Sequence, residues 1–365
     1  MNSFDRRQML RMGIALPTAA AFGFPTQTFA QSAGKGPINA NIFCHTMGTP
    51  ADVAQFTQIS GVSTNVSCWV SNTDIMTKLA SGAGRSTDLM NINCQFINAS
   101  MKRGLLAPID LTQVPNAKEL APFFSDATYN KADGKTYSVP FQFGYDTIVY
   151  NRKKLGEIDT YGALFDEKNK GQVSLRDDPQ QSMYQTALFL GHKDPQKLTS
   201  AELAEVTKFL ISKKPIFRSL WTGYAEAVSL LRSGEVTLIG DGWISMAWAL
   251  TDGGKNSDFA LAKVKEKAIV WTHDWIIPKE AETRSLASTY AFINWSLGAD
   301  QAANMGRKVG YVSPSTAGLK VLTPAEAKTI GYEDYADVYK NGYLEVALPD
   351  NYSEWVEAWN RFKAA

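Results

Sequence analysis

Residues 41–92 read NIFCHTMGTPADVAQFTQISGVSTNVSCWVSNTDIMTKLASGAGRSTDLMNI, and this stretch decides the fold class. Its apolar and β-branched runs predict three strands, at 41–45, 62–70 and 88–92. Thr49-Pro50 is a helix start, Ser60-Gly61 is a helix end, and an apolar stripe at 74–81 predicts a second helix. This strand–helix–strand–helix–strand order predicts an α/β fold with a parallel sheet and right-handed crossovers.

The rest of the chain continues to alternate strands and helices. Residues 135–151 form a long extended run interrupted only by Gly144, which predicts two strands that cross between lobes. Further helices are expected at 180–190, 200–212, 223–233, 285–297, 300–308 and 353–363, and further strands at 236–239 and 268–277. The sequence contains no repeat and no low-complexity tract, so we expect two α/β lobes joined by extended crossings.

The first thirty residues have the pattern of an export signal. Arg6-Arg7 stand in the register of a twin-arginine signal, a short apolar run follows at 13–24, and small residues lead to a cleavage site after Ala30. The apolar run is too short to span a bilayer, which takes ~20 residues. The alternative, an amphipathic helix, leaves the arginine pair unexplained. We therefore predict a twin-arginine signal peptide over 1–30 and a mature protein in the periplasm.

The charge of the mature chain restricts its partners. Removing the predicted signal takes away three arginines and one aspartate, so the formal net charge falls from +1 to about −1. Proteins that bind nucleic acid or anionic membrane surfaces carry an excess of basic residues, so we expect neither as a partner. The 9 Trp and 14 Tyr are many for such a chain and indicate an aromatic surface that faces a ligand.

Two further observations bear on chemistry. The three cysteines, Cys44, Cys68 and Cys94, fit no zinc motif, and either one bridge with a free thiol or buried thiols are compatible with the sequence. There is no nucleophile elbow and no phosphate loop, and the three histidines lack metal-ligand spacing. His273-Asp274 could form a general-base pair, but neighbours on a strand point to opposite faces. We therefore expect that the chain is not an enzyme and that it has no catalytic residues, no metal and no cofactor.

A series of short blocks runs through nearly the whole mature chain. The blocks are Gln55-Phe56-Thr57, Gly61-Val62, Asp88-Leu89, 104–110, 137–141, Gly144, Tyr150-Asn151, Asp177-Asp178, Gly234-Glu235-Val236, 271–278, 310–314 and Lys340-Asn341-Gly342. In this order and spacing they resemble the bacterial extracellular solute-binding proteins of ABC importers. The closest resemblance is to the spermidine/putrescine-binding, polyamine-like branch.

The resemblance implies a two-lobe, type II periplasmic-binding-protein fold with the ligand cleft between the lobes. Lobe 1 would comprise 31–142 plus 276–312, and lobe 2 would comprise 146–271 plus 316–365. Such a protein is expected to be a monomer that closes on a small organic cation, either polyamine-like or another amine. It would deliver this ligand to the permease of an ABC transporter and perform no chemistry.

Polyamine-like sites use carboxylates for the ammonium groups and aromatic faces for the methylene chain. Asp178 takes the first position of an acidic pair in the family, and Gln181 takes the second. Asp178 also suits a helix N-cap ahead of Pro179, and both roles stay open. The resemblance places a ligand-stacking Trp near Trp243, which could instead be core, and close to it lies Asp241.

The family also places an Asp just beyond a Trp at the second crossing. Counting back from Pro278 puts His273 at this position, next to Trp271. A shift of one residue would restore Asp274, but it would turn Trp271 to the other face of the strand. A solvated strand end is the alternative for this segment.

The remaining candidates come from strand ends and from matched blocks. They are Thr46, Asn93, Gln95, Tyr311 and Glu345. We expect Asp178 to bind the positive charge with help from Asp241 or Asp274, while Trp243 and Trp271 cover the apolar part. Because Gln181 and His273 depart from the family's charge pattern, a smaller cation, a quaternary amine or a zwitterion with one cationic end fits as well as a diamine or triamine.

A ferric-ion binder, or another small-solute receptor of the same fold, is the nearer alternative, and an exported enzyme is the more distant one. An iron site would draw on the neighbouring tyrosines Tyr332, Tyr335 and Tyr339. Tyr335 and Tyr339 are neighbours on a helix and equally suit the surface or the core.

The export pathway gives a first prediction. Replacing both Arg6 and Arg7 by lysine should leave uncleaved precursor in the cytoplasm, as measured by fractionation and immunoblotting, because the twin-arginine route depends on this pair. Unchanged export of the double variant would show that the general secretory route suffices.

Overall fold

The computed structural model describes residues 36–43, 49–69, 72–284, 286–332 and 335–365. The predicted signal peptide, Cys44 and Thr46 lie outside these ranges. Within them, no helix is long and apolar enough to cross a membrane.

One large sheet runs through the described chain in the order β2-β1-β3-β12-β7-β10-β8-β9, with β11 beside β7 and with β4 and β13 beside β12. Its strands are β1 Ile38–Ile42, β2 Thr64–Cys68, β3 Leu89–Asn93, β4 Leu106–Ala107, β7 Val139–Asn151, β8 Val173–Arg176, β9 Phe217–Trp221, β10 Leu238–Trp243, β11 Phe259–Leu261, β12 Ile269–Pro278 and β13 Tyr343–Leu344. A separate hairpin joins β5 Lys131–Ala132 and β6 Lys135–Thr136. β1 pairs in parallel with both β2 and β3, which confirms the predicted parallel order.

The helices pack around this sheet, and some of them carry the capping residues that the sequence predicts. They are α1 Pro50–Ser60, α2 Asn72–Ala80, α3 Ile97–Lys102, α4 Pro122–Ser125, α5 Arg152–Leu155, α6 Gln181–Phe189, α7 Ser200–Lys213, α8 Tyr224–Ser233, α9 Ile244–Leu250, α10 Leu286–Ser296, α11 Ala299–Val309, α12 Pro324–Ile330, α13 Tyr335–Asn341 and α14 Tyr352–Ala364. Thr49 and Asp52 form a capping box at the start of α1, and Gly61 ends the helix in the left-handed region at φ +70°.

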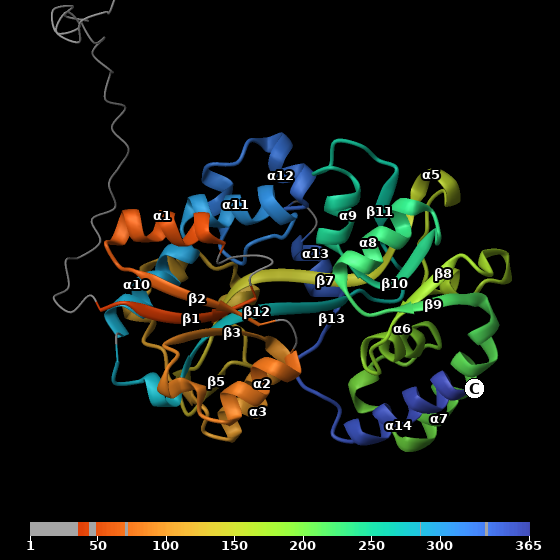
Figure 1. Ribbon diagram of the computed structural model, residues 1–365, viewed down its shortest axis with the longest axis horizontal. Helices are drawn as coiled ribbons and strands as arrows, with labels where there is room; N and C mark the ends of the chain where they lie inside the picture. Colours follow the sequence, from red (N-terminus) through yellow and green to blue (C-terminus); the bar gives the residue numbers. More distant parts are fainter. Residues whose placement is uncertain (1–35, 44–48, 70–71, 285, 333–334) are drawn as a thin grey trace, which may run out of the picture. The chain divides into compact units, whose positions relative to one another are not determined.

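Two large hydrophobic clusters divide the molecule into two lobes. The first lobe contains the cluster of Ile38, Phe56 and Trp275, and the second lobe contains that of Tyr184 and Trp355. In Figure 1, α1, α2 and α10 surround the first lobe, while α6, α7 and α14 surround the second. The long strands β7 and β12 pass from one lobe to the other (Figure 1). This arrangement is the predicted two-lobe α/β fold.

The crossing strand β7 differs from its prediction, because it is one strand of thirteen residues instead of two. Gly144 lies opposite Trp271 of β12, and a Cβ at this glycine would come within 2.4 Å of the indole. The glycine therefore does not break the strand. It provides the space in which the Trp271 ring lies.

The cysteines take one of the two predicted arrangements. Cys68 is disulfide-bonded, and Cys94 is a free thiol. Cys94 is fully buried, and its Sγ donates to the carbonyl of Glu345 at 2.9 Å. Because burial raises the pKa of this thiol, it is unreactive in the folded protein.

Gly144 gives a stability prediction. Gly144→Ala should lower the free energy of unfolding by ~1–3 kcal/mol, measured by chemical denaturation, because the new methyl group must displace the Trp271 ring. Gly223→Ala is the matched control, since a Cβ there meets no atom within 4 Å. It should cost at most about 1 kcal/mol, through the N-cap of α8. Equal effects of the two substitutions would contradict the packing role of Gly144.

Candidate functional site

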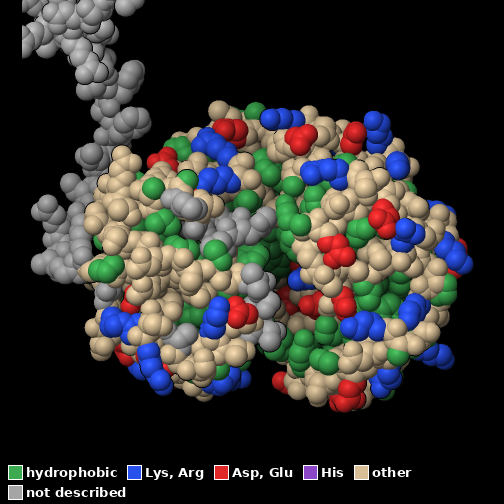
Figure 2. Space-filling model, viewed as in Figure 1, with side chains coloured by type: hydrophobic (Ala, Val, Ile, Leu, Met, Phe, Trp, Pro, Cys, Tyr) green, Lys and Arg blue, Asp and Glu red, His purple; other side chains and the backbone are tan. Residues whose placement is uncertain are grey.

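A cavity of about 120 Å³ lies where the two lobes meet. It is lined by Phe43, Trp69, Asn93, Gln95, Asp146, Arg176, Gln181, Trp243, Trp271, His273, Tyr311 and Glu345. Figure 2 shows a hollow between the lobes, with charged side chains on its second-lobe wall. The cavity is smaller than the ~300–1,000 Å³ of pockets that hold drug-sized molecules, so it suits a small solute.

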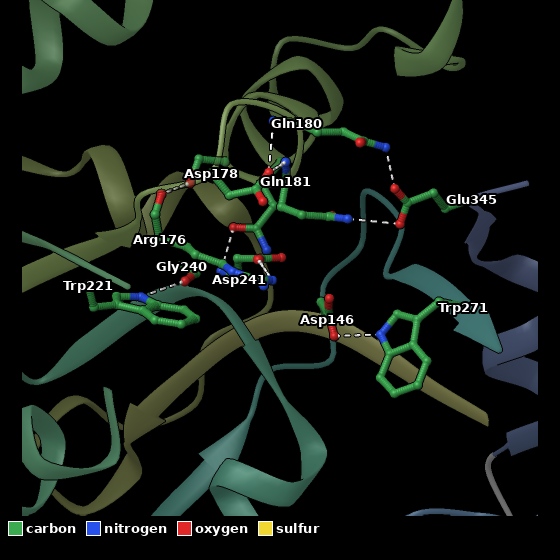
Figure 3. A network of polar contacts seen from close by, with 12 residues as sticks. Asp146, Arg176, Asp178, Gln180, Gln181, Trp221, Gly240, Asp241, Trp271 and Glu345 are labelled. Atoms are coloured by element: carbon green, nitrogen blue, oxygen red, sulfur yellow. Dashed lines mark hydrogen bonds and ion pairs between the residues drawn. The ribbon is translucent and has the colours of Figure 1, made fainter. Parts of the chain in front are cut away.

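An arginine and an aspartate form the base of the second-lobe wall. Arg176, the last residue of β8, donates from Nη1 to Oδ2 of Asp241 at 2.8 Å (Figure 3). Asp241 is fully buried and lies at φ +57°, where β10 bulges in its pairing with β7. The guanidinium carbon lies 5.5 Å from the ring centre of Trp221 and 5.4 Å from that of Trp243. The ion pair and the two rings hold the arginine in place.

Two further carboxylates face the cavity. Asp146 of β7 accepts a hydrogen bond from Nε1 of Trp271 at 2.8 Å. Glu345 accepts from Nε2 of Gln181 at 2.8 Å and also from Nε2 of Gln180 (Figure 3). Burial raises the pKa of Glu345 to about 8 and that of Asp146 well above its usual range, with nearby Asp241 adding to the shift at Asp146. Arg176 acts on both carboxylates from a distance, but neither forms an ion pair with a described residue.

Aromatic rings form the opposite, first-lobe wall. The ring of Phe43 lies 4.9 Å from that of Trp69, and His273 lies 5.6 Å from Phe43 and 5.1 Å from Trp271. Trp271 in turn meets Tyr311 at 5.6 Å. Burial lowers the pKa of His273 to about 3, so this side chain is neutral and adds an uncharged aromatic ring to the wall.

A direct contact joins the two walls. Nε2 of Gln180, which precedes α6, donates to Oε1 of Gln95, which follows β3, at 3.0 Å. The same Gln180 amide also bonds Glu345. The lobes therefore meet through a polar contact at the edge of the cavity.

Eight of the residues predicted from the sequence lie on the cavity wall: Asn93, Gln95, Gln181, Trp243, Trp271, His273, Tyr311 and Glu345. Their contact with a ligand stays a prediction. Thr46 lies outside the described residues, and three predicted carboxylates lie elsewhere.

Those three carboxylates have other partners. Asp178 accepts hydrogen bonds from the backbone N–H groups of Gln180 and Gln181, so it caps the start of α6. Asp241 lies beneath Arg176 and is not part of the cavity wall. Asp274 bonds the hydroxyls of Tyr129, Ser138 and Thr272 in the first lobe, and burial raises its pKa to about 6.

The register of β12 follows from these positions. Trp271 and His273 both line the cavity, while Asp274 points into the first lobe. Trp271 and His273 thus share the cavity face of β12, as the unshifted register predicts, while the match of His273 to the family's carboxylate position stays a prediction. The alternative of a solvated strand end is wrong, because every residue of β12 is buried.

Sequence reasoning missed four residues of the wall: Phe43, Trp69, Asp146 and Arg176. Asp146 lies within an extended run that otherwise indicates only strand structure, and Arg176 directly precedes Asp177-Asp178, the acidic pair that a polyamine-like pattern favours. The sequence signal that could have identified them is their position at the end of a strand or at a crossing between lobes, where α/β folds bind ligands.

The tyrosines considered for iron belong to a hydrophobic cluster. The hydroxyl of Tyr332 accepts from the backbone N–H of Ser313, and that of Tyr339 donates to the carbonyl of Phe123. In the described part of the chain, no group of three His, Cys, Asp or Glu residues could hold a metal ion.

Comparison with known proteins identifies the family. The family model of bacterial extracellular solute-binding proteins matches residues 52–329. The spermidine/putrescine-binding periplasmic protein of Escherichia coli (strain K12) is 25% identical over 323 residues, which cover 86% of this chain and 88% of that protein. The putrescine/cadaverine-binding protein of Pseudomonas aeruginosa is 26% identical over 278 residues, covering 70% of this chain and 73% of that protein.

A solved structure shows the same fold. The spermidine/putrescine ABC transporter substrate-binding protein of Streptococcus pneumoniae aligns with a TM-score of 0.77 at 19% identity, over 91% of this chain and 99% of that one. The fold, the cavity between its lobes and the family match agree, and the chain belongs to the bacterial extracellular solute-binding proteins.

Proposed function

We propose that this chain is the periplasmic substrate-binding component of an ABC importer, that it captures a small amine in the cavity between its lobes, and that it delivers the amine to a membrane permease. The observation that carries this proposal is the acidic surplus of the cavity. Asp146 and Glu345 face it and Asp241 lies beneath it, whereas Arg176 is the cationic side chain on its wall.

The electrostatics favour a cation. A carboxylate whose pKa is raised by burial is stabilised in its ionised form when a positive charge arrives beside it. An ammonium group would supply this charge to Asp146 and Glu345, and the lobes would exclude the water that otherwise weakens the attraction. An anion or a neutral sugar would leave both carboxylates without a counter-charge.

The aromatic wall favours an organic cation over a metal ion. The rings of Trp69, His273 and Trp271 are in contact along one side of the cavity. Such faces cover methylene or methyl groups and attract ammonium ions. The names of the relatives, which refer to spermidine, putrescine and cadaverine, also support an amine.

A ligand screen tests the proposal. The mature protein would be heated with amines, amino acids, monocarboxylates, sugars and ferric ion, since a ligand that binds the folded state raises the melting temperature. We expect amine-containing compounds to give the shifts. A shift with only neutral, purely anionic or metal ligands would overturn the proposal.

The carboxylate Glu345 gives a mutational prediction. At pH 8.5, where this group is ionised, Glu345→Gln should weaken binding of the best amine at least about thirtyfold in calorimetry, because it removes one partner of a buried charge pair. Asp178→Asn is the matched control. Asparagine caps helices about as well as aspartate, so this variant should keep the affinity within about threefold. The reverse ranking would assign the cation to Asp178.

The raised pKa of Glu345 predicts how binding depends on pH. Below about pH 8 the empty site holds a proton on this carboxylate, and an ammonium group must displace it. The affinity should therefore rise between pH 6 and 8, by up to about tenfold per unit for each proton released. Calorimetry in buffers of different ionisation enthalpy counts these protons. Proton uptake, or an affinity independent of pH, would contradict the assignment.

A further inference from the structure

We propose that the solute is a zwitterion, a small amino acid whose carboxylate binds Arg176 and whose ammonium group binds on the side of Asp146 and Glu345. This inference rests on the proposed function, because it takes the recognition of an amine as given. It adds a second charge of opposite sign and so excludes simple diamines as the best ligands.

Arg176 has unused hydrogen-bonding capacity toward the cavity. A guanidinium carries five N–H donors in a planar fork. The hydrogen bond from Nη1 to Asp241 is the only one that this fork makes to a described residue. The side chain is 29% exposed and lies on the cavity wall, so its other donors are open to a ligand.

Arg176 cannot turn away when a ligand enters. Its partner Asp241 has no exposed surface, and separating the two would leave a buried charge without a counter-ion. The rings of Trp221 and Trp243 also contact the guanidinium. A ligand that fills a cavity of about 120 Å³ therefore meets a fixed positive charge.

A fixed guanidinium edge selects a carboxylate. Its two parallel N–H groups match the two oxygens of a carboxylate and form a pair that is stronger than two neutral hydrogen bonds. The second ammonium group of a diamine would instead lie beside a like charge in a partly enclosed cavity. Repulsion in such an environment is stronger than in bulk solvent.

The opposite end of the ligand has matching acceptors. Oδ1 of Asp146 is held by the indole of Trp271, while Oδ2 accepts no hydrogen bond from a described residue. Oε1 of Gln181, another residue of the cavity wall, is buried and has no hydrogen-bond partner among the described residues. An ammonium group has three donors and could satisfy both atoms.

The surrounding carboxylates exclude a simple anion. Asp178 and Asp241 act electrostatically on Arg176, and Asp146 does so as well. A ligand with a carboxylate alone would face these charges with only one arginine to balance them. A zwitterion satisfies the arginine and the acidic groups together without changing the net charge of the site.

Matched ligands test this inference. Amino acids with the amine at the chain end, from glycine to 6-aminohexanoate, would each be compared by calorimetry with the diamine and the monocarboxylate of the same chain length. We expect one amino acid to bind at least about thirtyfold more tightly than its matched diamine, since the diamine replaces a favourable charge pair at Arg176 by a repulsive one.

The outcomes separate this inference from the proposed function. A diamine that binds as tightly as its matched amino acid, or more tightly, would overturn the zwitterion and leave the amine receptor intact. Binding of monocarboxylates without any amine, or of no compound in the series, would overturn both.

A double variant tests whether Arg176 is responsible for the preference for the amino acid over the diamine. Arg176→Gln alone would leave Asp241 buried and unpaired, so we combine it with Asp241→Asn, which keeps the pair uncharged. The double variant should lose the preference for the amino acid over the diamine and bring the ratio of affinities to about one or below. The exposed pair Arg218 and Glu235, both replaced by Gln, is the matched control and should keep the preference. Retention of the preference in the Arg176 and Asp241 double variant would overturn the role of Arg176.

Discussion

The burial of several carboxylates around a single guanidinium is the constraint on which the rest of this site depends. An ionised group inside a protein must be paired or must give up its charge. Arg176 pairs with Oδ2 of Asp241, which lies in the left-handed region where β10 bulges between Gly240 and Gly242. Asp146 and Glu345 accept hydrogen bonds from Trp271 and Gln181 but form no ion pair with a described residue, and the proposed amine would supply that missing charge.

The two long strands connect this charge arrangement to the fold. β7 carries Asp146 and β12 carries Trp271 and His273, and both strands run from one lobe into the other (Figure 1). The aromatic side of the cavity therefore belongs to the first lobe and to the crossing strand β12, while Arg176 and Gln181 belong to the second lobe. The cavity therefore sets an aromatic surface against a charged one, an arrangement that suits the amphipathic solute we propose.

The sequence predicted the fold closely and the site partly. Helix ends follow from local chemistry, as at Thr49 and Gly61, and the alternation of strands and helices indicated the parallel pairing of β1 with β2 and β3. It did not indicate the antiparallel pairing of β12 with β3 and β7 at the centre of the sheet. The alternation of side chains along a strand was enough to place Trp271 and His273 on the same face of β12. Aspartates were harder to assign, because a carboxylate that caps a helix, like Asp178, and one that faces a cavity, like Asp146, look alike in a sequence. Their difference arises only from packing between distant segments.

The most direct test of this account is a crystal structure of the mature protein grown with the tightest-binding amine from the screen. The account predicts electron density for the compound between the lobes, with its nitrogen within hydrogen-bond distance of Asp146 or Glu345 and its carbon chain against Trp271. Density for the amine outside this cavity, or an amine nitrogen placed away from both carboxylates, would contradict it.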